Sequence, residues 1–214
     1  MTHTAPSGLA AILAVAPVVP VVIVEAIEDA VPLARALVQG GLPVIEVTLR
    51  TPIALDAVRA IAAEVEDAIV GVGTVLDPAQ LAASERAGAR FAVSPGHTPR
   101  LLDAAAQSNL PLLPGIATAS EAIALIERGY AFAKFFPAEP AGGHAYLSAL
   151  ASPLPQLRFC PTGGITPESA PRYLALPNVV CVGGSWMLPR QRIVAKDWAA
   201  ITTASRVAAA LVRG

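Results

Sequence analysis

A lysine and a glutamate each stand inside an apolar run of this sequence, where ionisable side chains are rare. Lys134 lies in Ala-Phe-Ala-Lys-Phe-Phe, and Glu46 is flanked by Ile45 and Val47. Of the 15 Lys and Arg residues, only Lys134 and Lys196 are lysines. Lysine is almost never fully buried unless it is paired, and desolvation favours the neutral amine that attacks a carbonyl carbon. Lys134 is therefore a candidate covalent nucleophile.

Glu46 is the matching candidate for proton transfer. A partly desolvated carboxylate near a lysine can pass protons directly or through one water. Glu46 lies on the second expected strand and Lys134 on the sixth, and alternate strands share layers of side chains inside a barrel. The two side chains can therefore meet across the interior. A purely structural ion pair would leave the same pattern, so the sequence keeps both interpretations open.

Two glycine pairs follow the last two expected strands. Gly163 and Gly164 stand in Pro-Thr-Gly-Gly-Ile-Thr, and Gly183 and Gly184 precede Ser185. Exposed backbone N–H groups after the seventh and eighth strands form the phosphate site typical of parallel barrels. Tight turns also favour glycine, but two pairs on these two strands favour a phosphate site to which the Ser185 hydroxyl adds a donor.

Arg50 and Thr74 suit the other end of a substrate. Arg50 follows one expected strand and Thr74 ends another, and a guanidinium with a hydroxyl is a natural partner for a carboxylate. Arg50 as a solvated surface charge is the simpler alternative. Taken together, an amine, an acid–base carboxylate, a carboxylate clamp and a phosphate cradle describe a phosphorylated 2-keto acid that reacts through a Schiff base.

The elements that must position these residues alternate along the whole chain. Expected strands are Val18–Val24, Pro43–Thr48, Ala68–Thr74, Arg90–Ser94, Leu110–Gly115, Ala131–Phe136, Leu157–Thr162 and Val179–Gly183. Expected helices are Ala30–Gln39, Ile53–Glu64, Pro78–Ala87, Pro99–Ser108, Ser120–Arg128, His144–Ala149, Pro167–Leu174 and Lys196–Val212. Glycines at 40, 41, 88 and 129 are expected to end helices in left-handed backbone, and Asp77, Thr98, Thr118 and Thr166 to begin them as N-caps.

Near-continuous apolar strands separated by helices indicate a parallel sheet buried on both faces. Eight such units in 214 residues predict an α/β fold, a (β/α)₈ TIM barrel, as a single domain over residues 1–214. The apolar stretch Leu9 to Val24 contains two prolines and no basic residue precedes it, so we expect a short N-terminal helix and then a buried strand rather than a signal peptide or membrane span.

Composition narrows the class of protein. The net charge of −1 gives no basic surface for nucleic acid or an anionic membrane. Cys160 and Cys181, the two cysteines, are expected to be reduced core thiols of a cytoplasmic protein. No spacing of His, Asp or Glu resembles a metal site, so neither a metal nor another cofactor is expected.

With these residues established, the sequence resembles the class I family of 2-keto-3-deoxy-6-phosphogluconate and 4-hydroxy-2-oxoglutarate aldolases. The resemblance covers roughly residues 9 to 212. Its motifs are GLPVIEVTLRTP, VGVGTVLDPAQL, FAVSPG, LPLLPGIAT, AKFFPAE, RFCPTGGIT and VGGSW, which are highly specific as a set.

The resemblance implies a role for each motif residue. Lys134 would be the Schiff-base lysine and Glu46 the proton acceptor and donor, with Arg50 and Thr74 on the pyruvate carboxylate. Thr162 would lie near the C4 hydroxyl. Gly163, Gly164, Gly184 and Ser185 would surround the phosphate, while Pro95 and Phe136 shape the pocket. It also implies a cytoplasmic homotrimer of the Entner–Doudoroff pathway that releases pyruvate and D-glyceraldehyde 3-phosphate.

Several alternatives stay open on sequence alone. The substrate could be 4-hydroxy-2-oxoglutarate or the galactonate epimer, although VVIVEAI lacks the arginine that galactonate-type aldolases carry after the first strand. A phosphosugar isomerase or a non-catalytic binding barrel could share the phosphate site. His97 and His144 lie in loops near the active face, where substrate contact and simple solvation are both possible.

Overall fold

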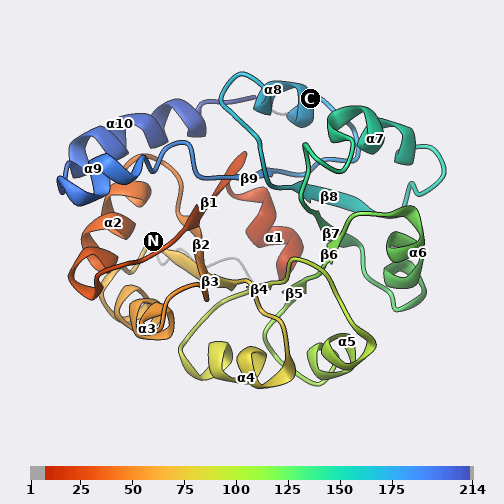
Figure 1. Ribbon diagram of the computed structural model, residues 1–214, viewed down its shortest axis with the longest axis horizontal. Helices are drawn as coiled ribbons and strands as arrows, with labels where there is room; N and C mark the ends of the chain where they lie inside the picture. The colour runs from red at the N-terminus through yellow and green to blue at the C-terminus, as the bar shows by residue number, and fades with distance from the viewer. Residues whose placement is uncertain (1–7, 213–214) are drawn as a thin grey trace, which may run out of the picture.

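The structure, a computed structural model that describes residues 8–212, is a parallel β-barrel surrounded by helices (Figure 1). Its strands are β1 (Val18–Val22), β2 (Val44–Thr48), β3 (Ile69–Gly73), β4 (Ala92–Val93), β5 (Leu112–Leu113), β6 (Gly115–Ile116), β7 (Phe132–Phe135), β8 (Arg158–Pro161) and β9 (Val182–Gly184). The strands pair in the order β5-β4-β3-β2-β1-β9 and β6-β7-β8, all in parallel. Bridges from Phe159 to Val179 and from Thr162 to Gly183 join the two sheets, which confirms the predicted barrel.

The fifth expected strand is divided in two. Pro114 separates β5 from β6, because proline has no N–H to donate to a ladder. The Pro114 carbonyl still accepts a hydrogen bond from the Lys134 N–H at 2.9 Å, so the path of the chain round the barrel continues. The prediction of one continuous strand here was wrong, although its position in the barrel was right.

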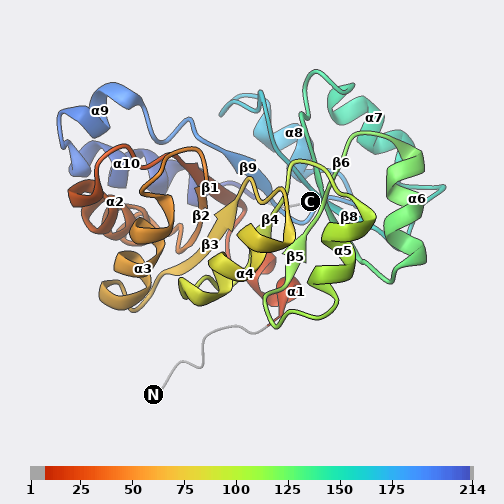
Figure 2. The same cartoon turned by 60° about the horizontal axis from the view of Figure 1, so that its bottom comes forward.

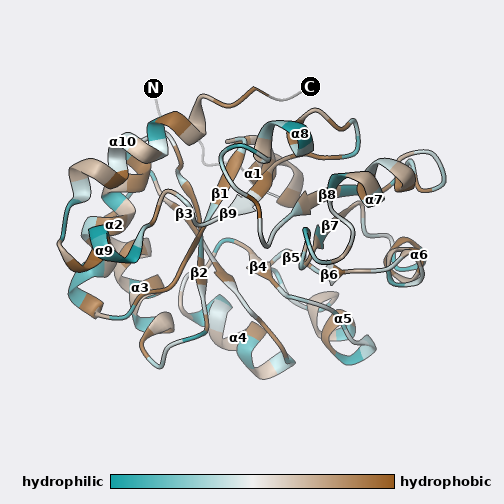
Figure 3. Ribbon diagram, turned by 45° about the horizontal axis from the view of Figure 1, so that its top comes forward, coloured by the Kyte–Doolittle hydropathy of each residue, from teal (hydrophilic) through white to brown (hydrophobic). Residues whose placement is uncertain are grey.

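The helices follow the predicted alternation with shifted ends. They are α1 (Leu9–Ala14), α2 (Ile27–Gln39), α3 (Ala54–Glu64), α4 (Pro78–Arg86), α5 (Pro99–Ala105), α6 (Ala119–Glu127), α7 (Gly143–Leu150), α8 (Ala170–Leu174), α9 (Arg190–Val194) and α10 (Trp198–Ala209). The short α9 was not expected, and the last helix begins later than predicted. Figure 3 shows hydrophilic and hydrophobic residues mixed along these outer helices, as expected for helices with one face on a barrel.

Most of the predicted helix ends are confirmed. Asp77, Thr98 and Thr118 each cap a helix by accepting a hydrogen bond from a backbone N–H. Thr166 accepts one from the Ser169 N–H at 3.3 Å, but α8 itself begins only at Ala170. Gly40 contradicts its prediction, because its φ is −82°. Its lack of a side chain instead lets α2 approach α10, since a Cβ there would lie 2.3 Å from Ser205 Cβ.

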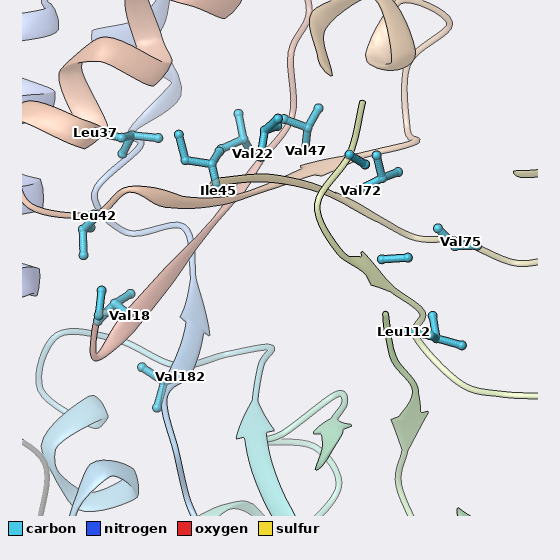
Figure 4. Close-up of a cluster of buried hydrophobic side chains, with 14 of the residues drawn as sticks. Val18, Val22, Leu37, Leu42, Ile45, Val47, Val72, Val75, Leu112 and Val182 are labelled. Carbon is cyan, nitrogen blue, oxygen red and sulfur yellow. The ribbon is translucent and has the colours of Figure 1, made fainter. Parts of the chain in front are cut away.

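Helix α1 closes the amino-terminal end of the barrel (Figure 2). Its buried Ile12 and Leu13 belong to an apolar cluster with side chains from the barrel interior, among them Val44, Phe91 and Cys160. A second, larger cluster fills the space between strands and outer helices, and Figure 4 shows part of it, with Val22 and Ile45 near Leu37 of α2.

Successive side chains along a strand face opposite sides, and the two clusters follow this alternation. In β2, Ile45 and Val47 face the helices, while Val44 faces the interior together with Glu46 and Thr48. Within residues 8–212, no helix has the length and apolar character needed to cross a membrane.

Candidate active site

The barrel brings the lysine and the glutamate together. Lys134 Nζ lies 3.2 Å from Glu46 Oε1, although the two residues are 88 positions apart in the sequence. Their side chains are only 5% and 4% exposed. The prediction that they meet across the interior is confirmed. At this distance and burial, a proton can pass between the amine and the carboxylate without crossing bulk water.

The space for Glu46 comes from a missing side chain on the next strand. A Cβ at Gly73 would lie 2.0 Å from Glu46 Oε1, so only glycine fits there. Two positions earlier, Gly71 leaves room for the ring of Phe91 in the same way. A Cβ at Gly71 would lie 2.4 Å from the nearest atom of that ring. Sequence reasoning missed Gly73, yet the period-two spacing of glycines in Ile69–Gly73 is a usable signal of large interior neighbours.

Phe136 connects the buried pair with an open cavity. Lys134 Nζ lies 5.2 Å from the centre of the Phe136 ring, a distance at which an ammonium and a ring face attract each other. Phe136 also lines a cavity of about 230 Å³. The rest of its lining comes from the carboxyl ends of β1 and β9 and from the segments after β2, β8 and β9, and consists of Val21, Arg50, Thr162, Gly163, Gly164, Ile165, Gly183, Gly184 and Ser185.

The backbone at the first glycine pair has the character of an anion site. Gly163 and Gly164 have φ values of 104° and 79°, which favour glycine over residues with a side chain. Within residues 8–212, the N–H groups of these two glycines donate to no backbone or side-chain acceptor. Two unused donors beside a cavity are suited to the oxygens of a phosphate.

The second glycine pair, Gly183 and Gly184, makes room for a neighbouring ring and is followed by the Ser185 hydroxyl. A Cβ at Gly184 would lie 1.9 Å from the Trp186 ring, so the glycine lets this ring fold back over the strand end. Ser185 is exposed and lines the cavity. Met187 is fully buried, and Trp186 packs against the same apolar cluster.

Arg50 lines the same cavity as the glycine loops. Among the described residues it has no ion pair or side-chain hydrogen bond. An unpaired guanidinium in this position raises the positive potential of the cavity and favours an anionic ligand. Arg50 is also exposed, so its contact with a substrate carboxylate stays a prediction beside the interpretation as a solvated surface charge.

Thr74 and Pro95 lie outside this cavity. Thr74 follows β3 with a φ of 64°, an uncommon backbone conformation for a β-branched residue that is often found at functional sites. Pro95 lines a separate hollow together with Val75 and His97. Their predicted contacts with substrate therefore stay predictions.

The two loop histidines have local contacts. His97 Nδ1 lies 2.8 Å from the carbonyl oxygen of Gly115, which pairs with Lys134 across the sheet. His144 is exposed and approaches the Tyr173 ring edge-on, with 6.2 Å between ring centres. Cys160 and Cys181 are buried thiols. No group of three or more His, Cys, Asp or Glu in the part of the chain that the structure describes is placed to hold a metal ion.

The fold and site define a class of protein: a parallel (β/α)₈ barrel with a buried amine–carboxylate pair and a glycine-lined anion cavity at the carboxyl ends of its strands. The family model for KDPG and KHG aldolase matches residues 9–204. The KHG/KDPG aldolase of Escherichia coli K12 is 54% identical over 197 residues, which are 92% of each chain.

Two solved structures are also similar. The KDPG aldolase of Legionella pneumophila, described with pyruvate captured as a covalent carbinolamine intermediate, superposes with a TM-score of 0.92 at 46% identity and covers 94% of this chain and 98% of its own. The 2-keto-3-deoxy-6-phosphogluconate aldolase of Zymomonas mobilis with 3-phosphoglycerate gives 0.91 at 48% identity and covers 95% of both chains. The chain belongs to the KDPG and KHG aldolase family.

Proposed function

We propose that this protein is a class I aldolase that reversibly cleaves 2-keto-3-deoxy-6-phosphogluconate to pyruvate and D-glyceraldehyde 3-phosphate. The observation that carries the proposal is the 3.2 Å contact of the buried Lys134 amine with Glu46. The cavity with unpaired Arg50 and free glycine N–H groups provides for the anionic groups of such a substrate.

The first step needs a neutral amine. Transfer of one proton from Lys134 Nζ to Glu46, 3.2 Å away, leaves a neutral amine and a neutral acid. The amine attacks the C2 ketone of the substrate and forms a carbinolamine. Glu46, directly or through a water, then returns a proton to the C2 oxygen, which leaves as water as the imine forms.

The protonated imine acts as an electron sink for carbon–carbon cleavage. Glu46, a carboxylate again after imine formation, takes the C4 hydroxyl proton directly or through a water, and the C3–C4 bond breaks with its electron pair passing into the enamine. D-glyceraldehyde 3-phosphate leaves, the enamine takes a proton at C3, and water hydrolyses the imine to pyruvate and free Lys134. Thr162, which lines the cavity beside Phe136, is the hydroxyl proposed to lie near C4.

The remaining predicted residues divide between the two ends of the substrate. Arg50 and Thr74 are assigned to the pyruvate carboxylate, with Pro95 and Phe136 as walls. Gly163, Gly164, Gly184 and Ser185 are assigned to the phosphate. The Zymomonas mobilis relative supports a phosphate ester as a ligand, since its structure is described with 3-phosphoglycerate.

A second candidate substrate is 4-hydroxy-2-oxoglutarate, because the Escherichia coli relative carries both substrates in its name. This molecule shares the reacting keto acid and replaces the phosphate end with a carboxylate. We also propose, from the family resemblance, that the protein works without a cofactor as a cytoplasmic homotrimer in the Entner–Doudoroff pathway. Light scattering of the purified protein measures the oligomeric state.

Trapping with borohydride tests the nucleophile. Purified protein is mixed with pyruvate and sodium borohydride, and the adduct is located by intact mass and peptide mapping. A single reduced adduct on Lys134 is the expected result. Adduction at Lys196 alone, or none, would overturn the proposed nucleophile and favour an isomerase or a binding barrel. Pyruvate release from each candidate keto acid then identifies the substrate.

A further inference from the structure

The glycine loop after β8 is attached to the loop after β7 by two backbone hydrogen bonds. Ala138 N–H donates to the Thr162 carbonyl at 2.8 Å, and Glu139 N–H donates to the Gly163 carbonyl at 3.0 Å. The loop that follows the lysine strand therefore supports the loop that lines the anion cavity. The Gly163 carbonyl and the Gly164 N–H lie on opposite edges of one peptide plane. Because the carbonyl is bonded to Glu139, the N–H on the other edge is free to donate to a ligand.

The side chain of Glu139 lies across the second glycine of this loop. A Cβ at Gly164 would lie 2.9 Å from both Cβ and Cγ of Glu139. The Glu139 carboxylate then accepts a hydrogen bond from the Tyr173 hydroxyl at 2.8 Å. Tyr173 lies on α8, the helix that follows the glycine loop in the sequence. The hydrogen bond therefore connects α8 to the loop after β7, with the glycine loop between them in the chain.

The hydrogen bond joins a buried phenol to a carboxylate on an exposed residue. Tyr173 is only 1% exposed, and its hydroxyl lies 3.3 Å from the Cβ position of Gly143. Burial raises the pKa of the Tyr173 phenol well above its ordinary value, and the hydrogen bond and charge of Glu139 raise it further. The phenol therefore remains protonated and able to donate throughout the neutral range.

We propose that Glu139 and Tyr173 are positioning residues for the phosphate end of the substrate: their hydrogen bond holds the Gly163–Gly164 loop in the conformation that presents its free N–H groups. This inference rests on the proposed function, because it assigns the pair to one subsite of that substrate. The pair touches neither the amine–carboxylate centre nor the reacting carbons. Its loss is expected to change phosphate recognition and to leave the chemistry of the keto acid intact.

The test compares two substrates in Tyr173→Phe, which keeps the ring and removes the hydroxyl. We expect KM for 2-keto-3-deoxy-6-phosphogluconate to rise about tenfold, the equivalent of one hydrogen bond to a charged group, with kcat within about twofold. KM and kcat for 4-hydroxy-2-oxoglutarate are expected to stay within about twofold. Glu139→Gln keeps an oxygen that accepts from the phenol and is expected to behave nearly as the parent.

Tyr146→Phe is the matched control. Its ring stacks on Phe135 with 5.6 Å between centres, and its hydroxyl has no hydrogen bond within the described residues. It is expected to leave both substrates unchanged. Equal losses on both substrates in Tyr173→Phe would indicate a general structural role and overturn the proposal, as would an unchanged KM for the phosphorylated acid.

Titration of inorganic phosphate, followed by ³¹P NMR, separates this inference from the proposed function. If the parent protein fails to cleave the phosphorylated acid, the proposed function fails. Weaker phosphate binding by Tyr173→Phe than by the parent and by Tyr146→Phe would still support the positioning role. Equal affinity in all three proteins would overturn it.

Discussion

The two ends of the barrel interior are built on different principles. At the amino-terminal end, α1 and the strand side chains form an apolar cluster that includes Leu13, Val44 and Phe91. At the carboxyl end, the interior contains the Lys134–Glu46 pair and then opens into the glycine loops. The change occurs within single strands, since Val44 and Glu46 are two positions apart on β2.

This difference shows how one scaffold separates stability from chemistry. At the closed end, each buried apolar group that is removed lowers the free energy of unfolding. At the open end, the functional atoms are one amine, one carboxylate and several backbone N–H groups, each held in place by neighbours. Substitutions at the two ends are therefore expected to separate into effects on unfolding and effects on turnover.

Lys134→Arg is expected to have the largest effect. A guanidinium stays protonated and cannot form an imine, so turnover should fall by at least about 10⁴-fold. The positive charge beside Glu46 is retained, and circular dichroism should show a folded protein. Pyruvate release and borohydride trapping are the measurements. Residual imine formation in the variant would show that a second amine reacts.

Gly73→Ala places a methyl group where the Glu46 carboxylate lies. The carboxylate has to move by an ångström or more, because the Cβ position is 2.0 Å from Oε1. Misplacement of a reacting group on this scale costs about 10²-fold in kcat. Gly96→Ala is the control, since its Cβ position has no heavy atom within 4 Å. Equal activity in the two variants would contradict the proton-transfer role of Glu46.

Leu13→Ala changes the closed end alone. Leu13 is 1% exposed, and its truncation should lower the free energy of unfolding by about 3 kcal/mol through lost burial and a cavity. The fraction of folded molecules trapped by pyruvate and borohydride should be unchanged. Val15→Ala, at a position 40% exposed, should change stability much less. Denaturant titration measures the free energies of unfolding. If Leu13→Ala lost trapping without losing stability, the separation of stability at the closed end from chemistry at the open end would be wrong.

The sequence predicts the barrel and the central pair because both depend on short-range patterns. Alternation of side chains within a strand decides which residues face inward, and capping residues begin the helices at Asp77, Thr98 and Thr118. Lys134 and Glu46 stand out since an ionisable group within an apolar run has few ways to be satisfied. No exact distance was needed to predict that they meet.

Contacts between distant residues that have no distinctive local sequence pattern were not predictable. The Glu139–Tyr173 hydrogen bond joins the loop after β7 to α8 over 34 positions, and neither residue lies in an unusual local pattern. Gly40 resembles a helix-ending glycine, and only the approach of α10 reveals its role. The cavity that Arg50 shares with the glycine loops likewise exists only once β2, β8 and β9 meet in the barrel.

Ser185→Ala is expected to have the smallest effect on turnover and the sharpest effect on selectivity. The serine hydroxyl lines the cavity beside the glycine loops, and one hydrogen bond to a charged group is worth about 1.5 kcal/mol or more. KM for 2-keto-3-deoxy-6-phosphogluconate should therefore rise about tenfold while kcat stays nearly constant, because uniform binding is lost rather than transition-state stabilisation.

The same variant should lose none of its imine chemistry, because Ser185 lies on the strand end that supplies the cradle and not the pair. Borohydride trapping with pyruvate measures that part separately. Ser148→Ala, at an exposed position of α7, is the matched loss of a hydroxyl elsewhere on the carboxyl half of the chain. If Ser185→Ala lowers kcat and leaves KM unchanged, the hydroxyl acts on the reacting atoms. The assignment of Ser185 to the phosphate end of the cavity, apart from the Lys134–Glu46 pair, is then wrong.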